Sequence, residues 1–199
     1  MTFARADQVT RCFIAAALLP LCTVTPLRAQ EPFSIVELQV NMAADISQVA
    51  LHQSWRPGRG AALGVLMPFY AGDFEFGGAI HRYSARTGVP GFAALWLYAG
   101  WGVHGTWRER VSISGTARLG NYRMSFDDAE STFAGVSSES ELVLGLGGGL
   151  ALRLAGPVFL YGRLDRLYVQ TLPSLAMWYV AAGMSIQIQA GEGWVNFFK

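Results

Sequence analysis

The chain is poor in cysteine, in charge and in long apolar runs. Its two cysteines, Cys12 and Cys22, both precede residue 30, so the remainder can hold no disulfide and no cysteine-bound metal. Charged residues make up only 15% of the chain and hydrophobic residues 52%. After residue 30, however, no run approaches the roughly 18 consecutive apolar residues that indicate a transmembrane helix. High apolarity without a helical span favours alternating strands in lipid.

The first 29 residues have the layout of a cleaved signal peptide. Arg5 and Arg11 supply the positive start, and Cys12–Leu21 is an apolar stretch too short to span a bilayer. Leu27–Ala29 is a plausible cleavage site, which leaves residues 30–199 as one domain. Cleavage removes three of the 15 Lys and Arg residues and one of the 14 Asp and Glu residues. The mature formal charge is then −1, which gives no electrostatic reason to expect nucleic acid as a partner.

The stretch 139–155 alternates between two kinds of side chain. One parity carries a stripe of leucines, Leu142, Leu144, Leu146, Leu150, Leu152 and Leu154. The other parity is small and rich in glycine, with Glu141 near one end and Arg153 near the other. A period of two indicates a β-strand with two distinct faces. An apolar bulky face and a small polar face suit a membrane β-barrel, whose outside meets lipid.

Seven other segments alternate in the same way, and short turns alternate with longer, more polar loops. The eight predicted strands are roughly 34–44, 60–70, 73–84, 92–105, 110–125, 140–154, 157–169 and 175–189. Each is near the length of a tilted transmembrane strand or somewhat longer. We therefore predict an all-β fold, an eight-stranded antiparallel up-and-down transmembrane barrel over about 34–189, followed by a short tail of 189–199. The short turns are expected on the periplasmic side.

Charged residues recur on the parity that faces the barrel interior. Six of them form the predicted lumenal charge network, namely Glu37, Glu75, Arg118, Arg153, Arg163 and Asp165. Buried charges must be paired, and the interior of eight strands is just filled by side chains. We expect Arg118 and Arg163 to pair with carboxylates among Glu37, Glu75 and Asp165 and so to plug the lumen. A narrow gated pore is the alternative.

Three local features fit the alternation less simply. Arg166 falls on the lipid-facing parity, where an arginine near the membrane surface can extend to headgroup phosphates. The fifth strand becomes polar on both faces after Gly120, which suggests an outer end or a bulge. Aromatic residues cluster near strand ends, and Tyr83, Phe92 and Tyr122 are expected in an interfacial girdle at the outer end.

From about Ser112 to Ile188 the chain resembles the small outer-membrane β-barrel domain family, the eight-stranded barrels of the OmpA and OmpX type. The resemblance rests on the stretches Gly115–Tyr122, Leu146–Leu150, Leu160–Arg163 and Ala182–Ile188. The last stretch is similar to the insertion signal of these barrels, which implies that role for Gly183, Ile186 and Ile188. The resemblance implies the fold and an outer-membrane location. The chain departs from the pattern by continuing beyond Gln189.

No motif of catalysis or cofactor binding is convincing in its context. Residues 100–105 match G-x-G-x-x-G, but a strand rather than a helix follows, so glycines that make room in a narrow barrel are the better interpretation. His81 and Ser84 weakly resemble the pair in barrel enzymes that deacylate lipid A, with Glu75 as a possible orienting acid. Residues three apart in a strand lie on opposite faces. We expect no cofactor and no metal.

The sequence thus predicts a non-enzymatic protein of the Gram-negative outer membrane, with a structural, surface-interaction or minor permeability role. Two alternatives remain, a lipid-A-modifying barrel enzyme and a soluble periplasmic lipocalin-like barrel. The expected partners are outer-membrane lipid and lipopolysaccharide, together with the barrel-assembly machinery during insertion. We expect a monomer.

Overall fold

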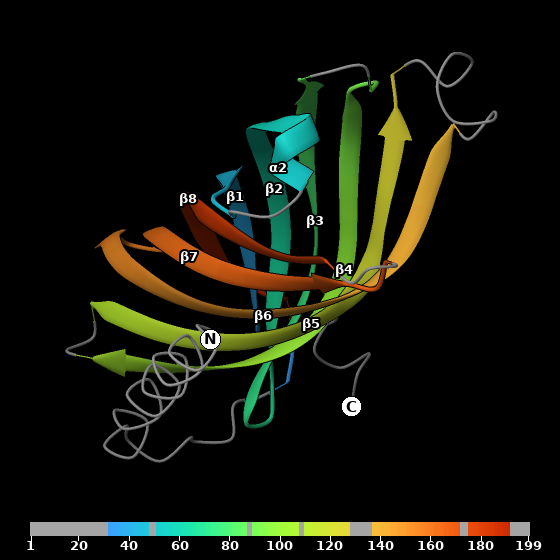
Figure 1. Ribbon diagram of the computed structural model, residues 1–199. Helices are drawn as coiled ribbons and strands as arrows, with labels where there is room; N and C mark the ends of the chain where they lie inside the picture. Colours follow the sequence, from blue (N-terminus) through green and yellow to red (C-terminus); the bar gives the residue numbers. More distant parts are fainter. Residues whose placement is uncertain are drawn as a thin grey trace, which may run out of the picture.

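Eight antiparallel strands form a closed barrel in the described part of the chain (Figure 1). The computed structural model describes residues 32–47, 51–86, 89–107, 110–127, 137–171 and 175–191. The strands are β1 (Ile35–Asp45), β2 (Trp55–Phe69), β3 (Gly72–Ala85), β4 (Phe92–Trp107), β5 (Val111–Phe126), β6 (Ser138–Ala155), β7 (Val158–Val169) and β8 (Leu175–Gln189). Each strand pairs with the next in sequence, and β1 pairs with β8 to close the wall. The predicted fold class is confirmed.

The described residues contain one short helix, α2 (Leu51–Ser54), and none long and apolar enough to cross a bilayer. The predicted signal peptide, 1–29, and the end of the predicted tail, 192–199, lie outside the described residues.

The two ends of the barrel differ in the length of their connections. Tyr70 and Ala71 join β2 to β3, and Gly156 and Pro157 join β6 to β7. Tyr70 and Gly156 have positive φ values of 51° and 52°, which lets the chain reverse in so few residues. We call this end, where β1 also begins and β8 ends, the short-turn end. The strand order places the β4–β5 connection at this end too. The opposite end carries the connections β1–β2, which includes α2, β3–β4, β5–β6 and β7–β8, and is called the long-loop end.

The strand boundaries differ from the predicted ones mainly in β2. This strand begins at Trp55, whereas the alternation of side chains predicts a start at residue 60. Pro57 and Gly58 interrupt the alternation of apolar and polar side chains, so the sequence pattern does not show where β2 begins. The pairing register with β3 shifts between Pro57 and Gly60, so the strand accommodates these residues in an irregularity. The alternative of a bulge at Gly120 is wrong, since β5 pairs in continuous register with β4 and β6 through that residue.

The outer surface of the barrel is apolar. The leucines of the β6 stripe, the longest single series, are between 43% and 58% exposed. On the neighbouring strands the same face carries Ile113 and Leu119 of β5 and Leu160 and Leu164 of β7, all more than 40% exposed. The interior holds the charged and aromatic side chains instead. The distribution of polarity is therefore the reverse of that in a water-soluble barrel.

The core lies inside the barrel towards the long-loop end. Its large members are the buried rings of Tyr83, Phe92, Trp96, Tyr98, Tyr122 and Tyr179. Tyr83 and Phe92 stack at 4.5 Å between ring centroids, and Trp96 and Tyr98 lie 4.4 Å apart. The predicted girdle position is therefore wrong for Tyr83, Phe92 and Tyr122, which are at most 2% exposed. Strand parity directs these rings inward although they lie near strand ends.

Replacing Trp96 by alanine tests the contribution of this core. Trp96 is 4% exposed, and its removal leaves a void that costs about 3–5 kcal/mol of unfolding free energy. Trp101 lies on the same strand, points outward and is 46% exposed, so Trp101→Ala is the matched control with a smaller cost. Urea unfolding of the detergent-folded barrel measures both. Equal costs for the two variants would contradict a lumenal core.

Candidate functional site

Four charged side chains form a closed ring of ion pairs across the middle of the lumen. Arg118 of β5 bonds Glu75 through Nε (2.7 Å to Oε2) and Asp165 through Nη1 (2.5 Å to Oδ1). Arg163 of β7 bonds the same two carboxylates at 2.9 Å and 2.8 Å. Each carboxylate oxygen thus accepts from one arginine. We call Glu75, Arg118, Arg163 and Asp165 the charge ring; their side chains are at most 8% exposed.

The charge ring depends on glycines in the wall around it. A Cβ on Gly147 would lie 2.0 Å from Oδ1 of Asp165 and 2.8 Å from Nη1 of Arg118. A Cβ on Gly100 would lie 2.8 Å from Cγ of Arg118. The glycines on the inner parity of β4 and β6 therefore leave the space that the arginine crosses. Tyr98 completes the surroundings, since its hydroxyl donates to Glu75 at 3.2 Å and its ring lies under the Arg118 guanidinium.

Glu37 and Arg153, the other two residues of the predicted lumenal set, lie apart from the charge ring. Glu37 accepts hydrogen bonds from the side-chain amides of Gln39 (3.0 Å) and Gln187 (2.9 Å). Arg153 is exposed, and its Nε donates to the carbonyl of Gly156 at 3.0 Å. Arg153 has the inward parity, but it lies at the end of β6, where a register shift follows it. The structure thus brings four of the six predicted residues together.

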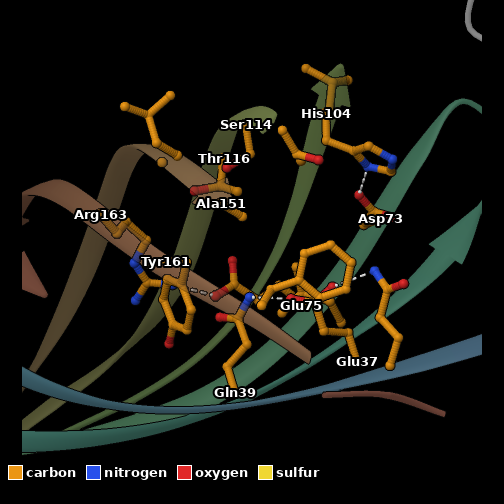
Figure 2. A pocket seen from close by; sticks show the side chains of 18 of the residues that line it. Glu37, Gln39, Asp73, Glu75, His104, Ser114, Thr116, Ala151, Tyr161 and Arg163 are labelled. Atoms are coloured by element: carbon orange, nitrogen blue, oxygen red, sulfur yellow. Dashed lines mark hydrogen bonds and ion pairs between the residues drawn. The ribbon is translucent and has the colours of Figure 1, made fainter. Parts of the chain in front are cut away.

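A cavity of about 530 Å³ occupies the half of the lumen between the charge ring and the short-turn end. Figure 2 shows its lining, with Glu37 and Gln39 of β1, Ser114 and Thr116 of β5 and Tyr161 of β7 around the hollow. At its edge, Nδ1 of His104 and Oδ2 of Asp73 lie 2.5 Å apart. Glu75 and Arg163 of the charge ring form part of the wall. The lumen is therefore hollow on one side of the ring and solid on the other.

A second polar cluster closes the long-loop end, and the sequence analysis missed it. Asp45, the last residue of β1, accepts bonds from the backbone N and hydroxyl of Ser47. Its other oxygen contacts His52 of α2 and the hydroxyl of Tyr83, both at 2.9 Å. The only sequence signal is that Asp45 continues the inward parity of Glu37. This Ser, His and Asp set is not a catalytic relay, because Ser47 donates to the aspartate and has no bond to the histidine.

The weak catalytic and cofactor motifs do not assemble into sites. His81 is buried in the lumen beside Tyr179, and Ser84 is exposed on the outer parity of β3. Glu75, the possible orienting acid, is held in the charge ring. Gly100 and Gly102 lie within β4 and do not begin a helix. Across the described ranges, no group of three His, Cys, Asp or Glu residues is placed to hold a metal ion.

The residues of the predicted insertion signal lie on β8, which closes the barrel. Ile186 and Ile188 point outward and are 41% and 48% exposed. Gly183 pairs with Asn41 of β1, and a Cβ there would lie 2.6 Å from Cα of Asn41. On the same outer surface, the guanidinium of Arg166 lies 4.9 Å and 5.2 Å from the ring centroids of Tyr168 and Trp178. The outward-facing arginine thus contacts two aromatic rings.

No protein-family model and no curated protein matches the sequence. Among solved structures, the N-terminal β-barrel domain of Pseudomonas aeruginosa OprF is similar, with a TM-score of 0.52 and 13% identity. The match covers 79% of this chain and 99% of that domain. Neisserial surface protein A matches with a TM-score of 0.49 and 17% identity, over 78% of this chain and 96% of that one. Ail of Yersinia pestis matches with a TM-score of 0.47 and 17% identity, over 80% and 100%.

The likeness to the OprF domain concerns the fold. This chain has the fold of the small eight-stranded outer-membrane β-barrels.

Replacing Arg118 by leucine should destabilise the barrel by about 3–5 kcal/mol, because two buried carboxylates then share one arginine. Arg123 lies on the same strand but points outward and is exposed, so Arg123→Leu is the control. Thermal unfolding, followed by the loss of the folded band on an unheated gel, compares the two variants. An unchanged midpoint for Arg118→Leu would contradict a stabilising charge ring.

Gly147→Ala tests the space that the charge ring requires. The added methyl group overlaps a carboxylate that is held by two arginines, so we expect a loss of about 1–3 kcal/mol. Gly148 is adjacent, faces outward and has room for a Cβ, whose nearest atom would lie 3.6 Å away. Gly148→Ala should therefore change the unfolding free energy by about 0.5 kcal/mol or less. A neutral Gly147→Ala variant in the same urea titration would show that the ring tolerates displacement.

Proposed function

We propose that this protein is an integral barrel of the Gram-negative outer membrane with a non-enzymatic structural or surface-interaction role. The observation that carries the proposal is the reversed polarity of the barrel. Leucines 43–58% exposed form a stripe on the outside, while the charge-ring carboxylates and Arg118 inside are at most 3% exposed. In water this arrangement would expose a large apolar surface, and in a bilayer it satisfies both faces. A lipocalin-like barrel in water requires the opposite polarity.

Conduction is the less favoured role. The charge ring and the aromatic core follow one another along the lumen, and the cluster around Asp45 lies beyond them. Eight strands enclose an interior that such side chains fill. Passage of a solute would require displacement of buried ion pairs and packed rings. We therefore assign the surface role to the wall and to the long-loop end. In this proposal the long-loop end faces the outside of the cell, and the short turns face the periplasm.

The partners in this proposal follow from the location. Outer-membrane lipid surrounds the apolar wall, and Arg166, between its two aromatic rings, is available to headgroup phosphates of lipid or lipopolysaccharide. The barrel-assembly machinery would act on β8, whose Gly183, Ile186 and Ile188 resemble an insertion signal. Every strand edge is already paired within the chain, so a monomer is sufficient.

Gel mobility and bilayer recordings test the proposal together. The mature chain, folded into detergent micelles, should migrate differently before and after boiling, because the closed barrel resists the gel detergent. A urea-unfolded sample is the control and should show one mobility. In planar bilayers the same folded protein should give no steady conductance. Solubility without detergent and a single mobility would refute the membrane proposal, while stable open-channel currents would favour a permeability role.

A further inference from the structure

The cavity on the short-turn side of the charge ring is unexpected in a barrel of this size. An eight-stranded wall encloses a space that side chains normally fill, or that holds one small ligand. Here the inner parity of three adjacent strands is small in the cavity wall, at Gly102 of β4, Ser114 and Thr116 of β5, and Gly149 and Ala151 of β6. The resulting hollow of about 530 Å³ has the volume of a small-molecule site.

One carboxylate in the cavity wall, that of Glu37, has no ion-pair partner among the described residues. Arg153 also lines the cavity, but it is exposed and donates to the carbonyl of Gly156. The charge ring contains two arginines and two carboxylates and is neutral within itself. Asp73 is paired with His104. Glu37 is half-buried and bonded only to the amides of Gln39 and Gln187, and none of the described residues forms an ion pair with it. A carboxylate withdrawn from water in this way favours a bound cation.

The wall opposite Glu37 presents hydroxyl groups. Ser114 and Thr116 are two residues apart on β5 and both line the cavity. The hydroxyl oxygen of Thr116 is buried, and the described residues offer it no hydrogen-bond partner. Buried polar atoms are normally paired, so this hydroxyl is suited to a ligand that both donates and accepts.

From these observations we propose that the cavity binds a small organic cation that carries a primary ammonium group and several hydroxyls. The ammonium group would donate to Glu37, and the ligand hydroxyls would bond Thr116 and Ser114 across the hollow. The charge ring and the aromatic core close the far side, so the ligand enters and leaves through the short-turn end. This site is for binding and not for passage, and it is an activity separate from the proposed envelope role.

Three sugars of similar size separate the contributions of charge and hydroxyls. Glucosamine carries the ammonium group, glucose lacks it, and N-acetylglucosamine has lost its charge by acylation. The full mature barrel in detergent micelles is titrated with each at mildly acidic pH, and the amide shifts of Thr116 and Gly149 are followed by NMR. We expect saturable shifts with glucosamine and affinities at least about tenfold weaker for the two uncharged sugars.

Two variants locate the site. Glu37→Gln keeps the shape but removes the charge, so glucosamine affinity should fall by about tenfold or more. One of the two acceptor oxygens becomes an amide donor, which the side chain of Gln39 or Gln187 can meet by turning its own amide oxygen towards it. Glu139→Gln is the matched control, since Glu139 is exposed at the long-loop end and should have no effect. Ala151→Leu fills the cavity and should abolish binding without any change of charge.

Two results would overturn the proposal. One is the absence of saturable shifts with glucosamine in a sample that shows the folded gel mobility, which would mean that water alone fills the hollow. The other is equal binding of the three sugars that is unaffected by Glu37→Gln. The gel mobility of each sample separates these outcomes from failure of the proposed membrane role, because an unfolded chain shows one mobility whatever sugar is added.

Discussion

Two arginines buried inside a narrow barrel impose the strictest constraint on this structure. Each must find a carboxylate, and Arg118 and Arg163 share the same pair, Glu75 and Asp165. Because every carboxylate oxygen of the ring accepts a bond from an arginine, the removal of one member leaves an uncompensated buried charge. The ring joins β3, β5 and β7, which are not neighbours in the wall. Backbone hydrogen bonds connect each strand only to its neighbours. The charge ring adds connections across the lumen, between strands that are not neighbours.

The charge ring also divides the lumen into two unlike halves. On the long-loop side, large rings fill the space, and a hydroxyl and carboxylate cluster around Asp45 covers them. On the short-turn side, glycine, serine and threonine line a hollow. The outer wall is mostly apolar over both halves, with exposed arginines such as Arg82 and Arg123 towards the long-loop end. The proposed contact with lipid therefore depends on the wall, and the proposed ligand site lies in the hollow half.

The strands could be predicted from the sequence because the alternation of apolar and polar side chains is a local property of each strand. The alternation predicts the bounds of β3, β5, β7 and β8 to within one or two residues. The predicted β2 is too short, because Pro57 and Gly58 interrupt the alternation of apolar and polar side chains. The same alternation identifies the charged residues that point into the lumen. The arginines pair with Glu75 and not with Glu37 because of the stagger between strands around the wall. This stagger is a property of the whole barrel, so the alternation within one strand does not predict it. The cluster of Asp45 with His52 depends on where a loop returns, and local pattern contains no information on that.

The order of the ring members along the chain has a consequence for the growing barrel. Glu75 and Arg118 lie in the first five strands, and Arg163 and Asp165 both lie on β7, bonded to each other at 2.8 Å. A sheet of β1 to β5 therefore already contains one opposite-charge pair, and β7 brings the second pair with it. Each of these two pairs is therefore neutral by itself before the barrel closes. Whichever end of the chain joins the wall first, neither arginine of this ring is placed there without a carboxylate on the accompanying strands.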